Sequence, residues 1–286
     1  MDGFIIVNKP QGFTSHDVCG KLRGILKTKK VGHSGTLDPL ATGVLVVGVG
    51  KATKLLNYLE NHTKTYVAEA LFGYQTDTYD ILGKTIETDD NYIPNDIAID
   101  DALSILIDKK TQLPPIYSAI KVNGKKLYDY AKNNEYVEIK PREIKIDLLN
   151  RVSNIRDKKV LIEVSANKGF YVRSLIHDLA KELNTCATMS KLTRTRAGNY
   201  DLSCAQSLEE IVENGPKFYS IEDTFSYLDK IEVNDYIAKL VRNGVVLDER
   251  QFNKKEMFRV YHNNQLIAIY EPKEDNKFGL VTLLGD

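Results

Sequence analysis

The chain has 286 residues, with 39 basic and 39 acidic side chains, so its formal net charge at pH 7 is zero. Hydrophobic residues make up 42% of the sequence and charged residues 27%, which is typical of globular proteins with one large domain or a large and a small one. No apolar run approaches the ~18 residues that a membrane helix needs, so we expect no contact with a membrane.

The cysteines and the first residues predict a cytoplasmic protein. Cys19, Cys186 and Cys204 are odd in number and far apart, which suits a reducing compartment and gives no metal-binding spacing. Residues 1–9 contain neither a basic region nor a cleavage site, so we expect no signal peptide. We also expect no bound metal.

The first part of the chain predicts strands and helices in an irregular order. Apolar or alternating sequence predicts strands over residues 3–8, 44–49 and 65–72. Thr14 or Ser15 can cap a helix whose apolar face is Val18, Leu22, Ile25 and Leu26. A second helix is predicted over residues 97–107.

The next elements decide the fold class. Residues 159–166 predict a strand, and the following amphipathic helix has its apolar face at Val172, Leu175, Ile176, Leu179 and Leu183. Because strands and helices do not alternate regularly, a doubly wound parallel sheet is not indicated. We expect an α+β fold with a mixed, largely antiparallel sheet and flanking helices.

The end of the chain predicts a small β module. Residues 215–235 are polar and rich in turn-forming residues, which is typical of a boundary. Three short strands follow, over residues 257–261, 266–270 and 279–284, with a turn at Asn263 and Asn264. We therefore expect a domain over residues 1–230 and a module over residues 231–286.

Basic side chains gather in three places although the net charge is zero. The clusters are Lys21, Arg23, Lys27, Lys29 and Lys30; Lys121, Lys125 and Lys126; and Lys191, Arg194 and Arg196. Any one of them is typical of a solvated surface. Three clusters, each beside a separate motif, favour a surface that binds a polyanion.

Residues 32–43, Gly-His-Ser-Gly-Thr-Leu-Asp-Pro-Leu-Ala-Thr-Gly, predict a short loop that presents one carboxylate, Asp38. Pro39 fixes its own φ and moves Asp38 out of the helical region. A connecting turn would account for the Asp-Pro pair. It would not account for the two glycines, the histidine and the two hydroxyls that stand before it.

This loop closely resembles the catalytic loop of the tRNA pseudouridine-55 synthases, the TruB family. Further segments resemble family motifs in the expected order: Lys-Pro-Gln-Gly-Phe-Thr-Ser at 9–15, Lys-Thr-Tyr at 64–66, Gly-Phe-Tyr-Val-Arg at 169–173 and Leu-Thr-Arg-Thr-Arg-Ala-Gly at 192–198. The resemblance covers about residues 3–205. It implies a pseudouridine-synthase fold and cofactor-free isomerisation of uridine to pseudouridine in the T-arm of tRNA, at position 55.

The resemblance assigns catalytic roles to Asp38, Tyr66 and Arg173. Asp38 would act as the nucleophile or as a base at the sugar, and the sequence leaves both roles open. Tyr66 would stack on the target base and help to move a proton at C5. Arg173 would pair with Asp38, because a guanidinium beside a carboxylate favours its ionised form. Without the resemblance, a strand tyrosine and a helix arginine are more often a sheet-face residue and a surface residue.

The resemblance also implies contacts to the substrate RNA. It assigns them to Lys9, His33, Asp80, Tyr171, Lys121, Arg142, Arg194 and Arg196. A supporting structural role for Lys9 and a turn-capping role for Asp80 stay open, and the segment with Arg194 would line the site or touch the phosphate backbone. His33 would fill the space that the flipped-out nucleotide leaves. A loop over about residues 114–142 would fold over the T-arm stem-loop of tRNA, and the module would resemble a PUA-type RNA-binding domain. We expect the protein to act as a monomer.

Three other function classes stay open. Residues 43–53 faintly resemble a phosphate-binding loop, but Leu45 and Ala52 stand where that motif needs a glycine and a hydroxyl. A non-catalytic module that binds or folds RNA would not need Asp38, Tyr66 and Arg173 together. A glycoside hydrolase usually needs two carboxylates, and the sequence presents one well-placed acid.

Overall fold

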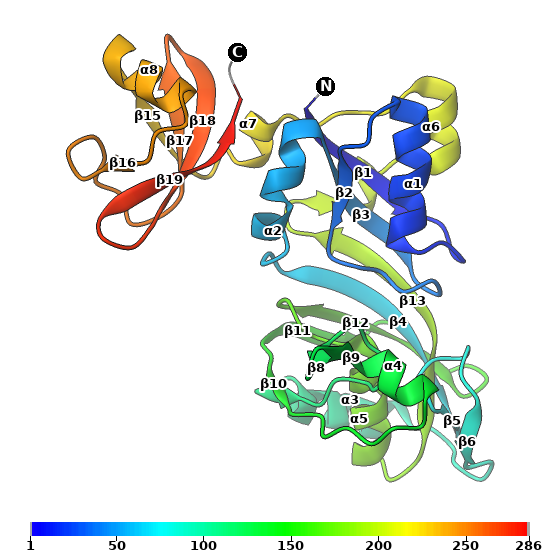
Figure 1. Ribbon diagram of the computed structural model, residues 1–286. Coiled ribbons are helices and arrows are strands. Elements are labelled where there is room, and N and C mark those ends of the chain that lie inside the picture. The colour runs from blue at the N-terminus through cyan, green and yellow to red at the C-terminus, as the bar shows by residue number, and fades with distance from the viewer. Residues whose placement is uncertain (1, 285–286) are drawn as a thin grey trace.

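The computed structural model describes residues 2–284 and is built around an eight-stranded sheet (Figure 1). Its strands, in spatial order, are β1 (Gly3–Lys9), β3 (Thr42–Val49), β13 (Ala187–Ala197), β4 (Lys64–Phe72), β12 (Lys159–Ala166) and β11 (Ile146–Arg151), with β2 (Val31–Ser34) beside β3 and β14 (Tyr200–Asp201) beside β13. Every pair is antiparallel except β13 with β3. The predicted mixed, largely antiparallel sheet is confirmed.

The sheet narrows where β3 meets β13. These strands pair only at Thr42 with Thr193 and at Gly43 with Arg194. Gly43 has φ +101°, and a Cβ there would lie 2.2 Å from the backbone oxygen of Arg194. Only glycine allows this approach. The long strands β4 and β13 cross this narrow region and join the two halves of the sheet (Figure 1).

Helices cover both halves of the sheet. Beside β1 and β3 lie α1 (Ser15–Leu26), the 3-10 helix η1 (Gly50–Leu55), α2 (Leu56–Leu59), the 3-10 helix η2 (Leu202–Cys204), α6 (Leu208–Asn214) and α7 (Ile221–Thr224). Thr14 caps α1 through a capping box with Asp17, and Val18 and Leu22 are buried, as predicted. In the other half, α3 (Asp96–Leu106) and α5 (Val172–Glu182) pack on one core with β4, β12 and β13.

Four strands of this sheet, β2, β11, β13 and β14, were not predicted from the sequence. The sequence did not predict β13, the central strand, because its polar residues hide the alternation of buried and exposed positions. Two register shifts, at Met189/Lys191 and Arg194/Arg196, also break the two-residue period. The expected loop from residue 32 is also partly strand, since β2 runs to Ser34. Its pairing with β3 extends the sheet, which local sequence does not reveal.

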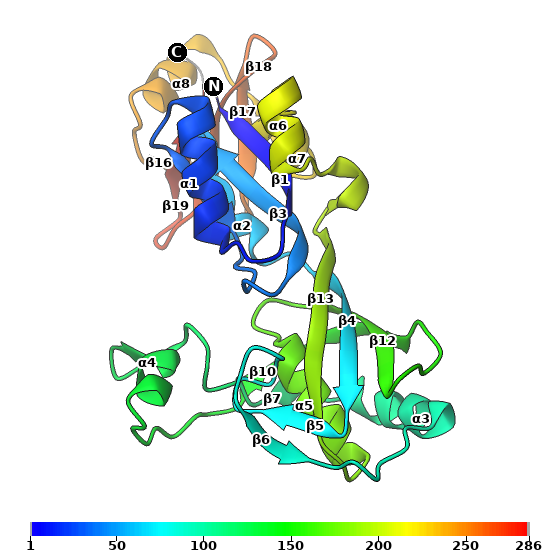
Figure 2. The same ribbon diagram turned by 90° about the vertical axis from the view of Figure 1, so that its right-hand side faces the viewer.

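The expected RNA-binding loop contains secondary structure of its own. It lies between β7 (Thr111–Gln112) and β10 (Arg142–Glu143), which pair with each other. Between them lie the hairpin of β8 (Lys121–Val122) and β9 (Lys125–Lys126) and helix α4 (Leu127–Lys132), which stands away from the main sheet (Figure 2). A second hairpin, β5 (Tyr74–Thr76) and β6 (Thr85–Thr88), extends from β4.

The C-terminal module has five strands where the sequence predicted three. Their order is β15 (Asp229–Glu232), β17 (Phe258–His262), β18 (Gln265–Pro272), β19 (Lys277–Leu283) and β16 (Leu247–Asp248), with α8 (Asp235–Arg242) packed on them. The two unpredicted strands are short and polar. The expected boundary between residues 230 and 231 falls inside β15, so we propose that the division lies before Asp229.

The module contacts the main domain. Tyr58 on α2 donates a 2.6 Å hydrogen bond to Glu271 on β18, and Ile269 packs with Phe225 in a shared core cluster. None of the helices within residues 2–284 is long and apolar enough to cross a membrane.

Candidate active site

A cleft of about 530 Å³ opens where the loop after β2, the start of α5 and the segment after β7 meet. Six of the residues singled out from the sequence line it: Asp38, Tyr66, Arg142, Tyr171, Arg173 and Arg194. They come from five separate elements of the chain. The fold therefore gathers residues that are distant in sequence around one cleft.

Asp38 lies in a loop that is tied to the start of α1. The backbone N–H of Leu37 donates a 2.8 Å hydrogen bond to the hydroxyl of Ser15, and the N–H of Gly12 donates one of 2.8 Å to the carbonyl of Pro39. These contacts hold the residues on both sides of Asp38. Its side chain is 39% exposed and lines the cleft.

Arg173, in the first turn of α5, lies behind Asp38. Its side chain is only 8% exposed, and one terminal nitrogen lies 3.0 Å from Oδ2 of Asp38 while the other lies 3.5 Å from Oδ2 of Asp80. The guanidinium also donates 3.1 Å hydrogen bonds to the carbonyls of Thr78 and Tyr117. These four contacts hold the guanidinium in place and fix the orientation of the Asp38 carboxylate beside it.

Tyr66 and Tyr171 provide aromatic side chains at the cleft. Tyr66 lies on β4, paired with Arg194 of β13, and is partly exposed. Tyr171 precedes α5, and burial raises the pKa of its phenol, so the hydroxyl stays protonated at neutral pH. Both aromatic side chains line the cleft.

Lys9 and Arg194, expected to contact RNA, are fully buried. Lys9 donates hydrogen bonds to the carbonyls of Pro10 and Phe13, and burial lowers its pKa to about 8 although Asp38 opposes the shift. Arg194 donates a 2.7 Å hydrogen bond to the carbonyl of Val44. Their burial does not fit direct contact with RNA: Lys9 takes the supporting role that the sequence left open, and Arg194 borders the cleft from inside the fold.

Besides Lys9 and Asp80, three predicted residues lie outside the set that lines the cleft. His33 is half-buried on β2, and burial lowers the pKa of its imidazole, which favours the neutral form. Lys121 is exposed on β8. Arg196 is exposed on β13, and its guanidinium lies 3.4 Å from Asp201.

Sequence reasoning assigned no individual role to several residues that shape the site. Tyr117 and Thr78 hold Arg173 through their backbone carbonyls, which no side-chain pattern reveals. Tyr79, beside Thr78, has φ +62° and stacks on His177 of α5 at 4.1 Å between ring centroids. The buried Gln112 contacts the backbone of Tyr171. For Gln112, the signal available in the sequence was a polar residue in a segment without a clear strand pattern.

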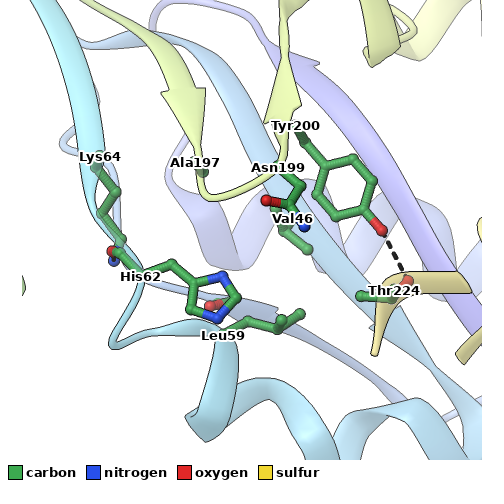
Figure 3. A pocket seen from close by; sticks show the side chains of 9 residues that line it. Val46, Leu59, His62, Lys64, Ala197, Asn199, Tyr200 and Thr224 are labelled. Carbon is green, nitrogen blue, oxygen red and sulfur yellow. Dashed lines mark hydrogen bonds between the residues drawn. The ribbon is translucent and has the colours of Figure 1, made fainter. Parts of the chain in front are cut away.

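A second, enclosed cavity lies near the end of β13 (Figure 3). His62, Lys64 and Tyr200 line it, and Tyr200 forms a 2.7 Å hydrogen bond with Thr224. Its volume of about 10 Å³ has room for about one water. This size excludes a nucleotide, so the cavity is not a second substrate site.

Within residues 2–284, no group of three or more His, Cys, Asp or Glu side chains is placed to hold a metal ion. The apparent phosphate-binding loop also differs from that motif in structure. Residues 50–55 form the 3-10 helix η1, not an open loop before an α-helix.

Comparison with known proteins places the chain in a family. Residues 23–172 match the model of the TruB family pseudouridylate synthase N-terminal domain, and residues 173–231 match that of the tRNA pseudouridylate synthase B C-terminal domain. Two relatives named tRNA pseudouridine synthase B are similar over nearly their whole length. The one from Aster yellows witches'-broom phytoplasma is 41% identical over 97% of this chain and 98% of its own. The one from Fusobacterium nucleatum is 43% identical over 96% of this chain and 97% of its own.

Solved structures agree with this result. A chain from the crystal structure of a Cbf5-Nop10-Gar1 complex matches with a TM-score of 0.71 and 25% identity, over 99% of this chain and 84% of that one. A chain from a structure of an H/ACA RNP bound to a substrate RNA shares the fold, with a TM-score of 0.69 and 23% identity over 98% and 83% of the two chains. The chain therefore belongs to the TruB family of pseudouridylate synthases.

Proposed function

We propose that this protein isomerises uridine to pseudouridine at position 55 in the T-arm of tRNA, with Asp38, Tyr66 and Arg173 as its catalytic residues. Isomerisation of uridine in tRNA follows from membership of the TruB family. The observation that carries the assignment of residues is the 3.0 Å ion pair between Asp38 and Arg173 in the cleft. The position in tRNA follows the family resemblance of the Asp38 loop.

The geometry suits a reaction that one carboxylate can start. The bond between N1 of uracil and C1′ of ribose breaks, the base turns, and C5 bonds to C1′ while C5 loses a proton and N1 gains one. Asp38 acts as the nucleophile or as a base at the sugar. Arg173 holds the carboxylate, and Tyr66 stacks on the base and assists the proton transfer at C5.

The recessed position of the reacting group requires a flipped-out nucleotide. Asp38 lies inside a cleft, and a base within a stacked stem-loop would not reach it. The neutral imidazole of His33 is suited to fill the gap left in the RNA. Asp80, which contacts Arg173, keeps the ion pair in place.

The substrate surface extends from the cleft along the segment between β7 and β10. Arg142 lines the cleft, and Lys121 is exposed on the same segment. Tyr128 adds an aromatic ring with Lys126 and Lys132 above it, at 5.3 and 5.2 Å from its centroid. This combination suits stacking on bases and contact with phosphates. The C-terminal module adds a further RNA contact, and the enzyme works as a cytoplasmic monomer.

Incubation with an unmodified tRNA transcript, with no cofactor added, tests the proposal. The wild-type protein is expected to form pseudouridine at position 55, and Asp38→Asn to lower the rate at least about 10³-fold while tRNA still binds. Asp178→Asn is the matched control, since this carboxylate also belongs to an ion pair, 2.7 Å from Lys109, but does not line the cleft. A near-normal rate for Asp38→Asn would overturn the proposal.

A further inference from the structure

Gln112 on β7 is a buried amide that contacts the backbone of a single residue. Its Oε1 accepts a 2.8 Å hydrogen bond from the N–H of Tyr171, and its Nε2 donates a 3.1 Å bond to the carbonyl of Tyr171. The side chain is only 3% exposed. Two bonds to one residue fix both its distance and its orientation, so Gln112 holds Tyr171 at two points.

The residue that Gln112 holds is the start of α5. Tyr171 is the N-cap of this helix and forms no capping hydrogen bond with its own side chain. Three residues later, still in the first turn, the hydroxyl of Ser174 donates a 2.8 Å hydrogen bond to the carbonyl of Leu113. Three hydrogen bonds from residues 112–113 therefore fix the first turn of α5.

This first turn carries Arg173. The arginine follows Tyr171 by two residues and reaches Asp38 at 3.0 Å. Asp38 itself is held by the loop after β2, on a different part of the sheet. The distance between the two charged groups is thus set by where α5 begins, and the contacts that set this position come from Gln112 and its neighbour Leu113.

Gln112 also anchors the segment that we expect to contact RNA. It pairs with Arg142 in the ladder between β7 and β10, so the two ends of this segment meet beside Tyr171. Arg173 donates to the carbonyl of Tyr117 within the same segment. The base of the RNA-contacting segment and the ion pair of the site are therefore joined through one buried amide.

We propose that Gln112 is a positioning residue, which holds Tyr171 and Arg173 so that the guanidinium meets Asp38 in the geometry that the reaction needs. This inference rests on the proposed function. Gln112 is not among the residues that line the cleft. Its contribution should therefore appear in the rate of the chemical step and not in the affinity for RNA.

The test compares variants of the full-length protein on an unmodified tRNA transcript. Gln112→Met keeps the volume of the side chain and removes both hydrogen bonds, whereas Gln112→Glu keeps the acceptor for the N–H of Tyr171. Gln206→Met is the matched control: Gln206 also joins two backbone groups, of Gly215 and Lys217, in a loop away from the cleft. Single-turnover rate, tRNA affinity and melting temperature are measured for each, and wild type and Asp38→Asn are assayed alongside.

The expected result is a split between rate and binding. Gln112→Met lowers the single-turnover rate about 10- to 100-fold, because a small misplacement of a catalytic group costs this much, while tRNA affinity stays within about threefold. Gln112→Glu is intermediate, and Gln206→Met reacts like wild type. If Gln112→Met does not fold, Ser174→Ala, which frees the same helix start from Leu113, decides the question in the same way.

Two outcomes would overturn the inference. A normal rate for Gln112→Met would show that the two hydrogen bonds from Gln112 to Tyr171 do not set the position of Arg173 relative to Asp38. A loss of rate that is matched by weaker tRNA binding and a lower melting temperature would show that Gln112 only stabilises the fold. Failure of the proposed function is distinct, since the wild-type protein itself would then form no pseudouridine.

Discussion

Asp38 and Arg173 form an ion pair at 3.0 Å in which the arginine is buried and the aspartate is partly exposed to the cleft. The side chain that reaches solvent is therefore the one that can meet a substrate. The guanidinium behind it is held by Asp80 and by the carbonyls of Thr78 and Tyr117. The difference in exposure between the two side chains supports Asp38 as the reacting carboxylate and Arg173 as the buried cation that holds it in place.

Arg173→Lys should impair the reaction although the charge is kept. A lysine ammonium cannot replace the planar fork that reaches both carboxylates and two carbonyls at once. We expect the rate to fall about 100-fold and the free energy of unfolding to drop by about 1–3 kcal/mol, because buried acceptors lose their donors. Single-turnover kinetics and urea unfolding measure the two effects.

The matched control is Arg151→Lys. Arg151 pairs with Asp96 and Asp100 at 2.8 and 2.7 Å, but these carboxylates are exposed and lie away from the cleft. The cost of this change should stay below about 1 kcal/mol, with a normal rate. Equal effects of the two substitutions would contradict a special role for Arg173.

Gly43→Ala should destabilise the narrow region of the sheet. Gly43 has φ +101°, and the new methyl group would lie 2.2 Å from the backbone oxygen of Arg194. Strain and overpacking together should lower the free energy of unfolding by about 2–4 kcal/mol. Gly20→Ala, in α1 with open space around it, should instead stabilise the protein by about 0.5–1 kcal/mol. Urea unfolding of both variants checks the difference in sign.

The pH dependence of stability should contain a contribution from Lys64. Burial lowers the pKa of its ammonium from 10.5 to about 8. Between these pH values the unfolded chain binds more protons than the folded one, so this lysine makes stability rise with pH across that window. Below about pH 8 both states are protonated and the cost of burial is constant.

Lys64→Met isolates this contribution, because all other titrating groups are shared with the wild type. Relative to this variant, the free energy of unfolding of the wild type should rise by about 2 kcal/mol from pH 7.5 to pH 10. Lys159→Met, at a partly exposed lysine on β12, is the control for removing a lysine from the same sheet. A flat difference between the wild type and Lys64→Met would show that Lys64 is not buried in its charged form.

Binding of tRNA should depend steeply on salt concentration, and Lys121 should contribute measurably to this dependence. Phosphate contacts release counterions, so removing one exposed contact lowers the slope of log Kd against log salt concentration by about 1. We expect this for Lys121→Ala. Lys109→Ala should leave the slope unchanged, because Lys109 already pairs with Asp178. The contrary result, an unchanged slope for Lys121→Ala, would remove β8 from the RNA surface.

The sequence by itself determined several local elements and the family. Apolar periodicity predicted α1, α5, β4 and β12, which each bury one face. Continuous apolar runs predicted β1 and β3, which are buried on both faces. The Asp38 loop and the motifs around Tyr66 and Arg173 indicated the family, since few loops combine these residues in this order. Both results depend on short stretches of chain.

Only the tertiary structure decided how these stretches meet. Pairing across the sheet makes β13 the central strand, although its register shifts hide it from local analysis. The same packing buries Arg194, which the sequence placed in a basic surface cluster, and also buries Lys9. It also places the amide of Gln112 on the backbone of Tyr171. These contacts join residues that are distant in the chain, and burial and backbone hydrogen bonding between such residues leave no pattern within either segment.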